Sequence, residues 1–209
     1  MNRTVTTGVI QKIMTKDGVT GHMVIACPLM AGKKAKDPVK VNYPVIEFNS
    51  KTKPAKIGTA FKGGDRVKVI GHMQSYIRKN DKGATESNDY IYADEVTYEE
   101  SKFAKVFGVK GRIYDTQVND VYLSGTVSGM NKLPQSQGYE VFLDPEGEEK
   151  NRLRIVYFKK SDDFENSIRI GAKIAVVAMI QSQTVPDVSN KAGYSFQNTV
   201  ASDIVKMEG

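Results

Sequence analysis

An internal repeat constrains the fold of this 209-residue chain more than any other feature of its sequence. One shift of 117 positions aligns two glycines, two valines and two prolines in the same order: Gly8 with Gly125, Val24 with Val141, and Pro28 with Pro145. Shifts of 107 and 108 then align Gly64–Ile70 with Gly171–Val177 and Ala93–Val96 with Ala201–Ile204. The order is kept while the spacing changes, as it does when loops differ in length. We therefore interpret the chain as a tandem repeat, with chance similarity among common residues as the alternative.

Each copy has the residue pattern of β-strands. Apolar residues at alternate positions, such as Val67 and Val69, predict a strand. The aromatic and β-branched run Tyr90–Ala93 predicts another. One short helix is predicted in each copy, near Ala55–Phe61 and near Asp163–Ile168, after the third strand. Five strands and one helix in about 100 residues are typical of the OB-fold, a five-stranded Greek-key barrel.

The predicted fold class is therefore all-β with small helical insertions, built as two tandem OB-fold five-stranded Greek-key barrels. The first domain is predicted at residues 1–102 and the second at residues 103–209. Residues 103–120 are expected to form a linker, in which Val106–Ile113 has the pattern of an extra strand.

The excess of positive over negative charge is confined to the first half of the chain. Residues 1–102 hold 17 Lys and Arg against 11 Asp and Glu, whereas residues 103–209 hold 13 of each. This difference between the halves favours an anionic partner, most simply a nucleic acid. The first half would bind most of that partner. A solvated basic surface without a partner is the alternative.

The residue inventory argues against most enzyme chemistry. One cysteine, Cys27, excludes an intramolecular disulfide and a multi-cysteine zinc site, and His22 and His72 lack ligand spacing. Asp94 and Glu95 are neighbours on a predicted strand, so their carboxylates point to opposite faces and do not converge. We expect no catalytic residues, no metal and no cofactor.

The chain is also expected to act away from membranes. No stretch approaches 18 apolar residues, and no apolar segment follows the first residues as in a secretory signal. The expected location is the cytoplasm, which would be the host cell cytoplasm if the protein is encoded by a phage.

Two segments resemble strands of bacterial and phage single-stranded-DNA-binding proteins. Lys62–Ser75 is similar to that family's fourth strand, in which a Lys-Gly-Asp turn precedes a β-branched strand, a glycine and a long hairpin. Tyr90–Val96 resembles the last barrel strand, which typically ends in Ala-acid-acid-Val. The second half keeps the resemblance more faintly, in Arg169–Lys173 and Val200–Ile204. The resemblance implies OB-fold barrels that bind single-stranded DNA without catalysis.

The sequence departs from that family in two respects. It contains no tryptophan, so Tyr or Phe must replace the family's stacking tryptophans. No Gly/Pro/Gln-rich tail with an acidic tip follows the last predicted strand, and in the cellular family that tip recruits partner proteins. A tandem, tailless form is therefore more similar to a phage or mobile-element member than to a housekeeping one.

Binding of a single strand without sequence readout needs cations for phosphates and aromatic rings for stacking bases. The resemblance places stacking rings at Phe48, near Tyr43 and, in the second half, at Phe158. Phe48 shares a strand face with Ile46, so a core position is the alternative for that ring. The predicted nucleic-acid-binding residues are Lys33, Lys34, Lys36, Lys40, Tyr43, Phe48, Lys51, Lys53, Tyr76, Arg78, Lys79, Lys82, Tyr90, Tyr92, Arg152, Arg154, Phe158 and Tyr194.

From these features we expect sequence-independent binding and protection of single-stranded DNA in replication or recombination, for a phage or mobile element. The first barrel is expected to be the main binder, and a homodimer or higher oligomer on DNA is compatible with this interpretation. Two alternatives stay open. One is a structural or protein-interaction OB module. The other is a single-stranded RNA binder, because stacking and phosphate contacts do not distinguish RNA from DNA.

Overall fold

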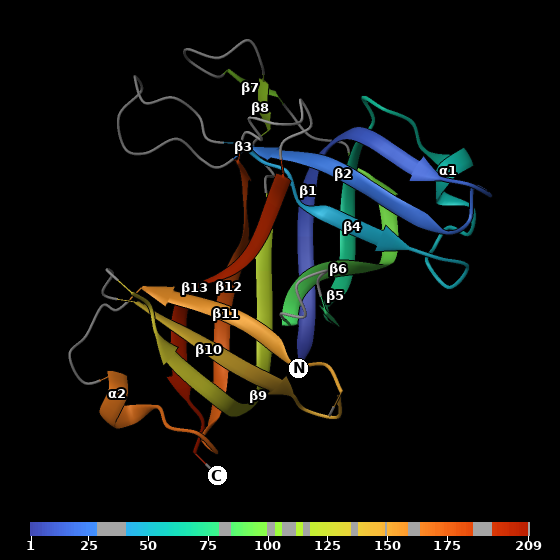
Figure 1. Ribbon diagram of the computed structural model, residues 1–209. Helices are drawn as coiled ribbons and strands as arrows, with labels where there is room; N and C mark the ends of the chain where they lie inside the picture. The colour runs from blue at the N-terminus through green and yellow to red at the C-terminus, as the bar shows by residue number, and fades with distance from the viewer. Residues whose placement is uncertain are drawn as a thin grey trace. The chain divides into compact units, whose positions relative to one another are not determined.

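The computed structural model describes residues 1–28, 41–79, 85–99, 103–105, 112–114, 118–134, 138–148, 150–158, 164–185 and 194–208. Its elements in chain order, shown in Figure 1, are β1 (Asn2–Thr15), β2 (Gly21–Pro28), β3 (Val41–Asn42), β4 (Val45–Phe48), α1 (Ile57–Ala60), β5 (Arg66–Lys79), β6 (Thr85–Tyr98), β7 (Phe103–Lys105), β8 (Arg112–Tyr114), β9 (Asn119–Lys132), β10 (Gly138–Pro145), β11 (Leu153–Phe158), α2 (Phe164–Ser167), β12 (Lys173–Val185) and β13 (Tyr194–Lys206). Both helices lie within the ranges predicted from the sequence.

The chain forms two compact units that interleave along the sequence. The N-terminal unit consists of Val5–Gly71 and Ile91–Asn119. The C-terminal unit consists of Met1–Thr4, His72–Tyr90 and Asp120–Gly209. The outer part of the β5–β6 hairpin therefore belongs to the C-terminal unit, a grouping that the sequence pattern does not indicate.

In the N-terminal unit five strands close into a barrel. β1 pairs with β2, β2 with β4, β4 with β6, β6 with β5, and β5 with β1. The β4–β6 pairing is parallel, with Ile46 opposite Ile91, and α1 follows β4. This strand order and helix position are those of the OB-fold. The barrel encloses fully buried apolar side chains that include Met23, Ile25 and Val67.

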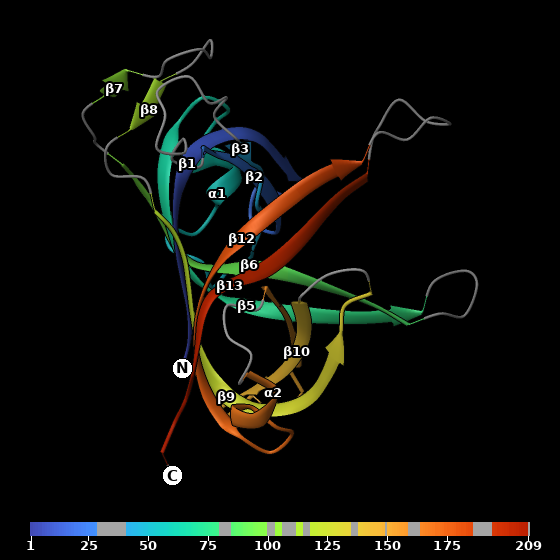
Figure 2. The same cartoon turned by 90° about the vertical axis from the view of Figure 1, so that its left-hand side faces the viewer.

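In the C-terminal unit the strands β9 to β13 close the same circuit. β9 pairs with β10, β10 with β11, β11 in parallel with β13, β13 with β12, and β12 with β9. The helix α2 lies between β11 and β12 in sequence, and its Phe164 packs against Tyr139 and Tyr157 with ring centroids 5.2 and 4.7 Å apart. β12 and β13 continue beyond the barrel as a long antiparallel hairpin (Figure 2). The predicted all-β OB-fold class is confirmed.

Equivalent positions of the two barrels make equivalent backbone hydrogen bonds. Gly64 donates its N–H to the carbonyl of Ile10 over 2.8 Å, and Gly171 donates to the carbonyl of Val127 over 2.8 Å. Both glycines have left-handed backbone angles, with φ of 91° and 87°, which glycine adopts without steric cost. The sequence repeat aligns these glycines with each other and these acceptors with each other.

The short strands β7 and β8 pair antiparallel as a separate two-stranded sheet, with Phe103 opposite Tyr114. The extra strand was predicted at residues 106–113, and residues 106–111 lie outside the described part of the chain. Within the described residues, neither helix is long and apolar enough to span a membrane.

Candidate nucleic-acid interface

The outer face of β2, β4 and β6 carries exposed polar and aromatic side chains, and we name it the barrel face. β4 lies between the other two strands (Figure 1). One row of this face runs from His22 on β2 through Glu47 on β4 to Tyr92 on β6. Tyr43, which precedes β4 on the same alternating side, is 39% exposed. The barrel face therefore presents the exposed ring of Tyr43 and the half-buried ring of Tyr92.

Phe48 does not belong to the barrel face, which corrects its prediction as a stacking residue. Its side chain is 1% exposed and lies among the largest fully buried side chains of the chain. Alternation along β4 explains this position, because Ile46 and Phe48 point inward while Val45 and Glu47 point outward. A buried ring cannot stack on a base, so Tyr43 and Tyr92 remain the aromatic candidates in this barrel.

The lysines after β4 are attached to a fixed turn. Thr52 is buried, and its hydroxyl donates to the carbonyl of Ala93 on β6 over 2.7 Å. The backbone N–H of Lys53 donates to the carbonyl of Asp94 over 2.9 Å. Lys51 and Lys53 are exposed on either side of this anchor. Their backbone positions are thus set by β6, and both ammonium groups can serve phosphates at the edge of the barrel face.

A carboxylate lies in the middle of the barrel face. Burial raises the pKa of the Glu47 carboxyl above its ordinary value, and the positive charge of His22 opposes that shift. A negative charge on this face repels phosphates, so the protonated form of Glu47 is the form that favours an anionic strand. Binding of the strand should in turn raise the pKa of Glu47 further.

We expect Glu47→Gln to bind oligo-dT about 2- to 5-fold more tightly at neutral pH, as removal of one partly exposed like charge implies. The gain should be smaller at a pH low enough to protonate Glu47 of the parent than at neutral pH, because the charge difference between the two proteins then disappears. Fluorescence anisotropy at both pH values measures the difference. All other titratable groups are present in both proteins, so an equal gain at both pH values would contradict the assignment.

A second aromatic pair lies on the β5–β6 hairpin, in the C-terminal unit. The ring of Tyr76 is 55% exposed, and the ring of Tyr90 meets it edge-on with a centroid distance of 5.7 Å and an interplanar angle of 71°. This T-shaped contact orients the Tyr76 ring and leaves much of it open to a ligand. Both residues were predicted from the sequence, and the structure brings them together.

Several predicted contacts cannot be placed. Lys33, Lys34, Lys36, Lys40 and Lys82 lie outside the described residues, and so do the side chains of Arg78, Lys79 and Tyr194. These positions stay predictions from the sequence.

Two asparagines fix the hairpin in the C-terminal unit, and sequence analysis missed both. The amide oxygen of Asn2 accepts the N–H of Met73 over 2.9 Å, and that of Asn151 accepts the N–H of Ser75 over 2.9 Å. Their amide nitrogens both donate to the carbonyl of Met73, over 2.9 and 2.8 Å, and to the carboxylate of Glu148. The two side chains thus satisfy backbone groups of β5 as a neighbouring strand would.

The other strand of the hairpin is anchored through Asp89. The side chain of Asp89 is almost fully buried and accepts the backbone N–H of Arg154 over 3.2 Å. Gln197 donates its side-chain amide to the carbonyl of Asp89 over 3.1 Å. Together with the asparagine contacts, these bonds explain why residues 72–90 group with the second barrel.

Asn151→Ala is expected to lower the free energy of unfolding by about 1–3 kcal/mol, because the N–H of Ser75 loses its partner in a part-buried position. Urea denaturation followed by circular dichroism measures this loss. Asn131→Ala, at an exposed position of β9 in the same unit, is the matched control and should unfold within about 0.5 kcal/mol of the parent. Equal stability of the two variants would show that the hairpin is held by other contacts.

Among the described side chains, the outer face of the second barrel offers the exposed ring of Phe158 and two arginines. Phe158, at the end of β11, is 52% exposed, which suits a stacking role. Arg152 pairs with Asp144 over 2.9 Å, and this hydrogen-bonded ion pair lowers the pKa of the Asp144 carboxyl. Arg154 pairs with Glu140 and also donates to Asn198. Because both guanidinium groups already have acidic partners, this face attracts phosphates less strongly than its arginines alone suggest.

Comparisons with known proteins give a structural likeness only. No protein-family model and no curated protein matches the chain. Among solved structures, the wild-type single-stranded DNA binding protein from Thermus aquaticus superposes with a TM-score of 0.68 at 14% identity, covering 100% of this chain and 94% of that chain. A deletion mutant of the same Thermus aquaticus protein gives a TM-score of 0.68 at 13% identity, with 100% and 95% coverage. At this identity the likeness shows the fold: the chain has the OB-fold architecture seen in that single-stranded DNA binding protein.

Proposed function

We propose that this protein binds single-stranded DNA without sequence preference and without catalysis. The observation that carries the proposal is the barrel face, which presents the exposed Tyr43 and the half-buried Tyr92, together with the exposed lysines Lys51 and Lys53 on the anchored turn that follows β4. Binding of a single strand requires aromatic rings on which the bases stack and cations that bind the phosphates. Every base has a π-face, so stacking needs no particular sequence. The fold likeness to a single-stranded DNA binding protein supports the same function.

The proposal also states that the two halves of the chain contribute unequally to binding. We propose that residues 1–102 and 103–209 are a tandem repeat, which the matching strand circuits and the matching Gly64 and Gly171 hydrogen bonds support. The first half carries the whole excess of positive charge, so it should make most of the phosphate contacts. The ion pairs of Arg152 and Arg154 support a weaker electrostatic contribution from the second barrel.

The proposal also includes a biological setting. A protein that coats exposed strands would protect them during replication or recombination, in the cytoplasm. We further propose that a phage or mobile element encodes the protein. We also propose that it assembles into a homodimer or higher oligomer on DNA.

Quenching of tyrosine fluorescence by poly-dT and by poly-U tests the proposal directly. The chain has 10 tyrosines and no tryptophan, so the emission reports tyrosine. We expect saturable quenching by poly-dT, because bases stack on exposed rings. Stronger quenching by poly-U would indicate an RNA-binding protein. Absence of quenching by both polymers would contradict nucleic-acid binding and favour a structural or protein-interaction module.

A further inference from the structure

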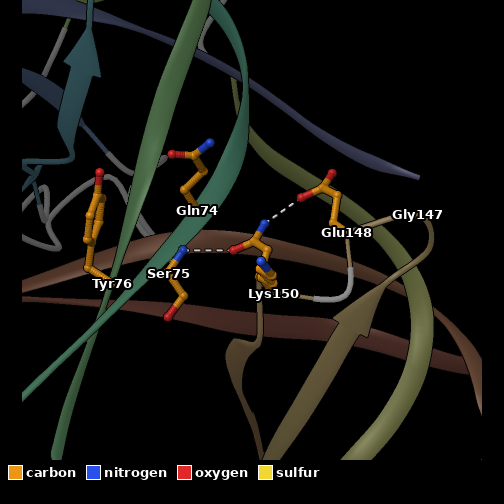
Figure 3. Close-up of a pocket in the computed structure, with 7 residues that line it drawn as sticks. Gln74, Ser75, Tyr76, Gly147, Glu148 and Lys150 are labelled. Atoms are coloured by element: carbon orange, nitrogen blue, oxygen red, sulfur yellow. Dashed lines mark hydrogen bonds between the residues drawn. The ribbon is translucent and has the colours of Figure 1, made fainter.

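A cleft in the C-terminal unit lies between the β5–β6 hairpin and the turn that joins β10 to β11. It has a volume of about 540 Å³, within the range of small-molecule sites. Gln74, Ser75 and Tyr76 line it from β5, and Glu148, Lys150 and Asn151 line it from the turn (Figure 3). We propose that this cleft binds one nucleotide of a single strand, with the base on Tyr76 and the adjacent phosphate on Lys150. The proposal rests on the proposed function and extends it to a defined subsite.

The cleft is formed before any ligand arrives. Asn151 accepts the N–H of Ser75 over 2.9 Å and donates to Glu148, and Figure 3 shows both bonds as dashed lines. The same asparagine donates to the carbonyl of Met73 over 2.8 Å. These bonds tie the turn to the strand, so the two walls keep their separation. A ligand that enters a preformed site loses less free energy to ordering of the protein.

The aromatic wall is suited to a base. In Figure 3 the Tyr76 ring and the Glu148 side chain stand on opposite sides of Ser75. The Tyr76 ring is 55% exposed and is oriented by the edge-on contact with Tyr90. Gln74 lies on the same strand face as Tyr76, because side chains two positions apart share a face. A base stacked on Tyr76 would thus have an amide group within its reach for a hydrogen bond.

The charged wall indicates how the nucleotide would be oriented. Lys150 is exposed, and among the described residues no carboxylate forms an ion pair with its ammonium group, so it can bind a phosphate. The Glu148 carboxylate instead accepts amide hydrogens from Asn2 and Asn151. A carboxylate repels phosphate but can accept an N–H of a base. The phosphate should therefore lie at Lys150 and the base edge toward Glu148.

The location of the cleft changes the expected roles of the two halves. Tyr76 comes from the basic first half and Lys150 from the neutral second half, yet both lie in one compact unit. A separated second half would lack the aromatic wall, and a separated first half would lack the lysine. The second half thus contributes to binding through this cleft despite its zero net charge.

Anisotropy titrations of the full chain with fluorescein-labelled oligo-dT of about 30 nucleotides test the subsite. Tyr76→Leu should weaken affinity about 5- to 150-fold with an unchanged salt slope, because a stacking ring but no cation is lost. Tyr76→Phe should bind more tightly than Tyr76→Leu, since it keeps the ring. Lys150→Ala should reduce the slope of log affinity against log salt by about 0.7. Tyr98→Leu and Lys206→Ala, exposed residues outside the cleft, should leave both quantities close to those of the parent.

The outcomes separate the subsite from the proposed function. If the parent does not bind oligo-dT, the proposed function fails and the subsite fails with it. If the parent binds and both cleft variants bind like the parent, the subsite is wrong and the function stands. Oligo-dT that contains iododeoxyuridine gives a readout free of folding effects, because its photochemical crosslink should map to the peptide that contains Tyr76. A crosslink found only elsewhere would overturn the proposal.

Discussion

The double variant Tyr43→Ala/Tyr92→Ala is expected to bind oligo-dT about 30-fold more weakly than the parent, or more weakly still. Each lost stacking ring typically costs about 1–3 kcal/mol, and two rings at the lower limit already give this factor. The salt dependence should stay unchanged, because neither substitution removes a cation. Fluorescence anisotropy at several salt concentrations measures both quantities.

Tyr98→Ala is the control for this double variant. Tyr98 is 60% exposed and ends β6, but its ring packs on the buried Phe61 and its hydroxyl donates to the carbonyl of Ala60, so it lies away from the row of His22, Glu47 and Tyr92. Its removal should leave affinity within about 2-fold of the parent, as for a surface change away from the site. Far-UV circular dichroism must first show that all variants are folded. If the folded double variant binds like the parent, the barrel face is not the base platform, and Tyr76 and Phe158 become the leading candidates.

Gly71→Ala is expected to lower the free energy of unfolding by about 3 kcal/mol or more, the largest effect of a single methyl group that we anticipate. A Cβ atom at this position would lie 2.1 Å from the carbonyl oxygen of Tyr92 and 3.0 Å from its carbonyl carbon. These are backbone atoms of the neighbouring strand β6, so relief of the clash requires β5 and β6 to separate. Urea denaturation measures the loss.

Gly63→Ala provides the matched control. A Cβ atom there would meet its nearest neighbour, the carbonyl oxygen of Gln11, at 3.7 Å, which is an ordinary contact. Its stability should lie within about 0.5 kcal/mol of the parent. Equal stability of the Gly71 and Gly63 variants would mean that β5 and β6 do not approach as closely as described.

The strands and their faces were predictable from the sequence because burial imposes a period of two. Along β4 the alternation of Val45, Ile46, Glu47 and Phe48 matches the observed alternation of half-buried and buried side chains. The same alternation gave the position of Phe48 but not its role, since an aromatic residue suits both a core and a stacking surface. Only the closure of the barrel decides between them, by placing Phe48 inside.

The amide contacts of the hairpin were not predictable, because polar residues at the first position of a strand and in a turn follow no period. Asn2 and Glu148 are 146 positions apart in sequence, and neither belongs to a recognisable motif. The grouping of residues 72–90 with the second barrel depends on such contacts, as does the cleft beside Tyr76. Tyr76 and Tyr90 could be selected from the sequence because aromatic residues fit a stacking role. Asn151 and Lys150 could not be selected, because only the fold places them at the cleft beside Tyr76.

The salt dependence of oligo-dT binding by the full chain tests the central claim most directly. If about four phosphates are neutralised, with each contact contributing about −0.7, log affinity should fall against log salt with a slope near −3. Titrations by anisotropy between about 50 and 200 mM salt give this slope. A slope close to zero, or no binding at the lowest salt concentration, would contradict a protein that binds single strands through its basic half.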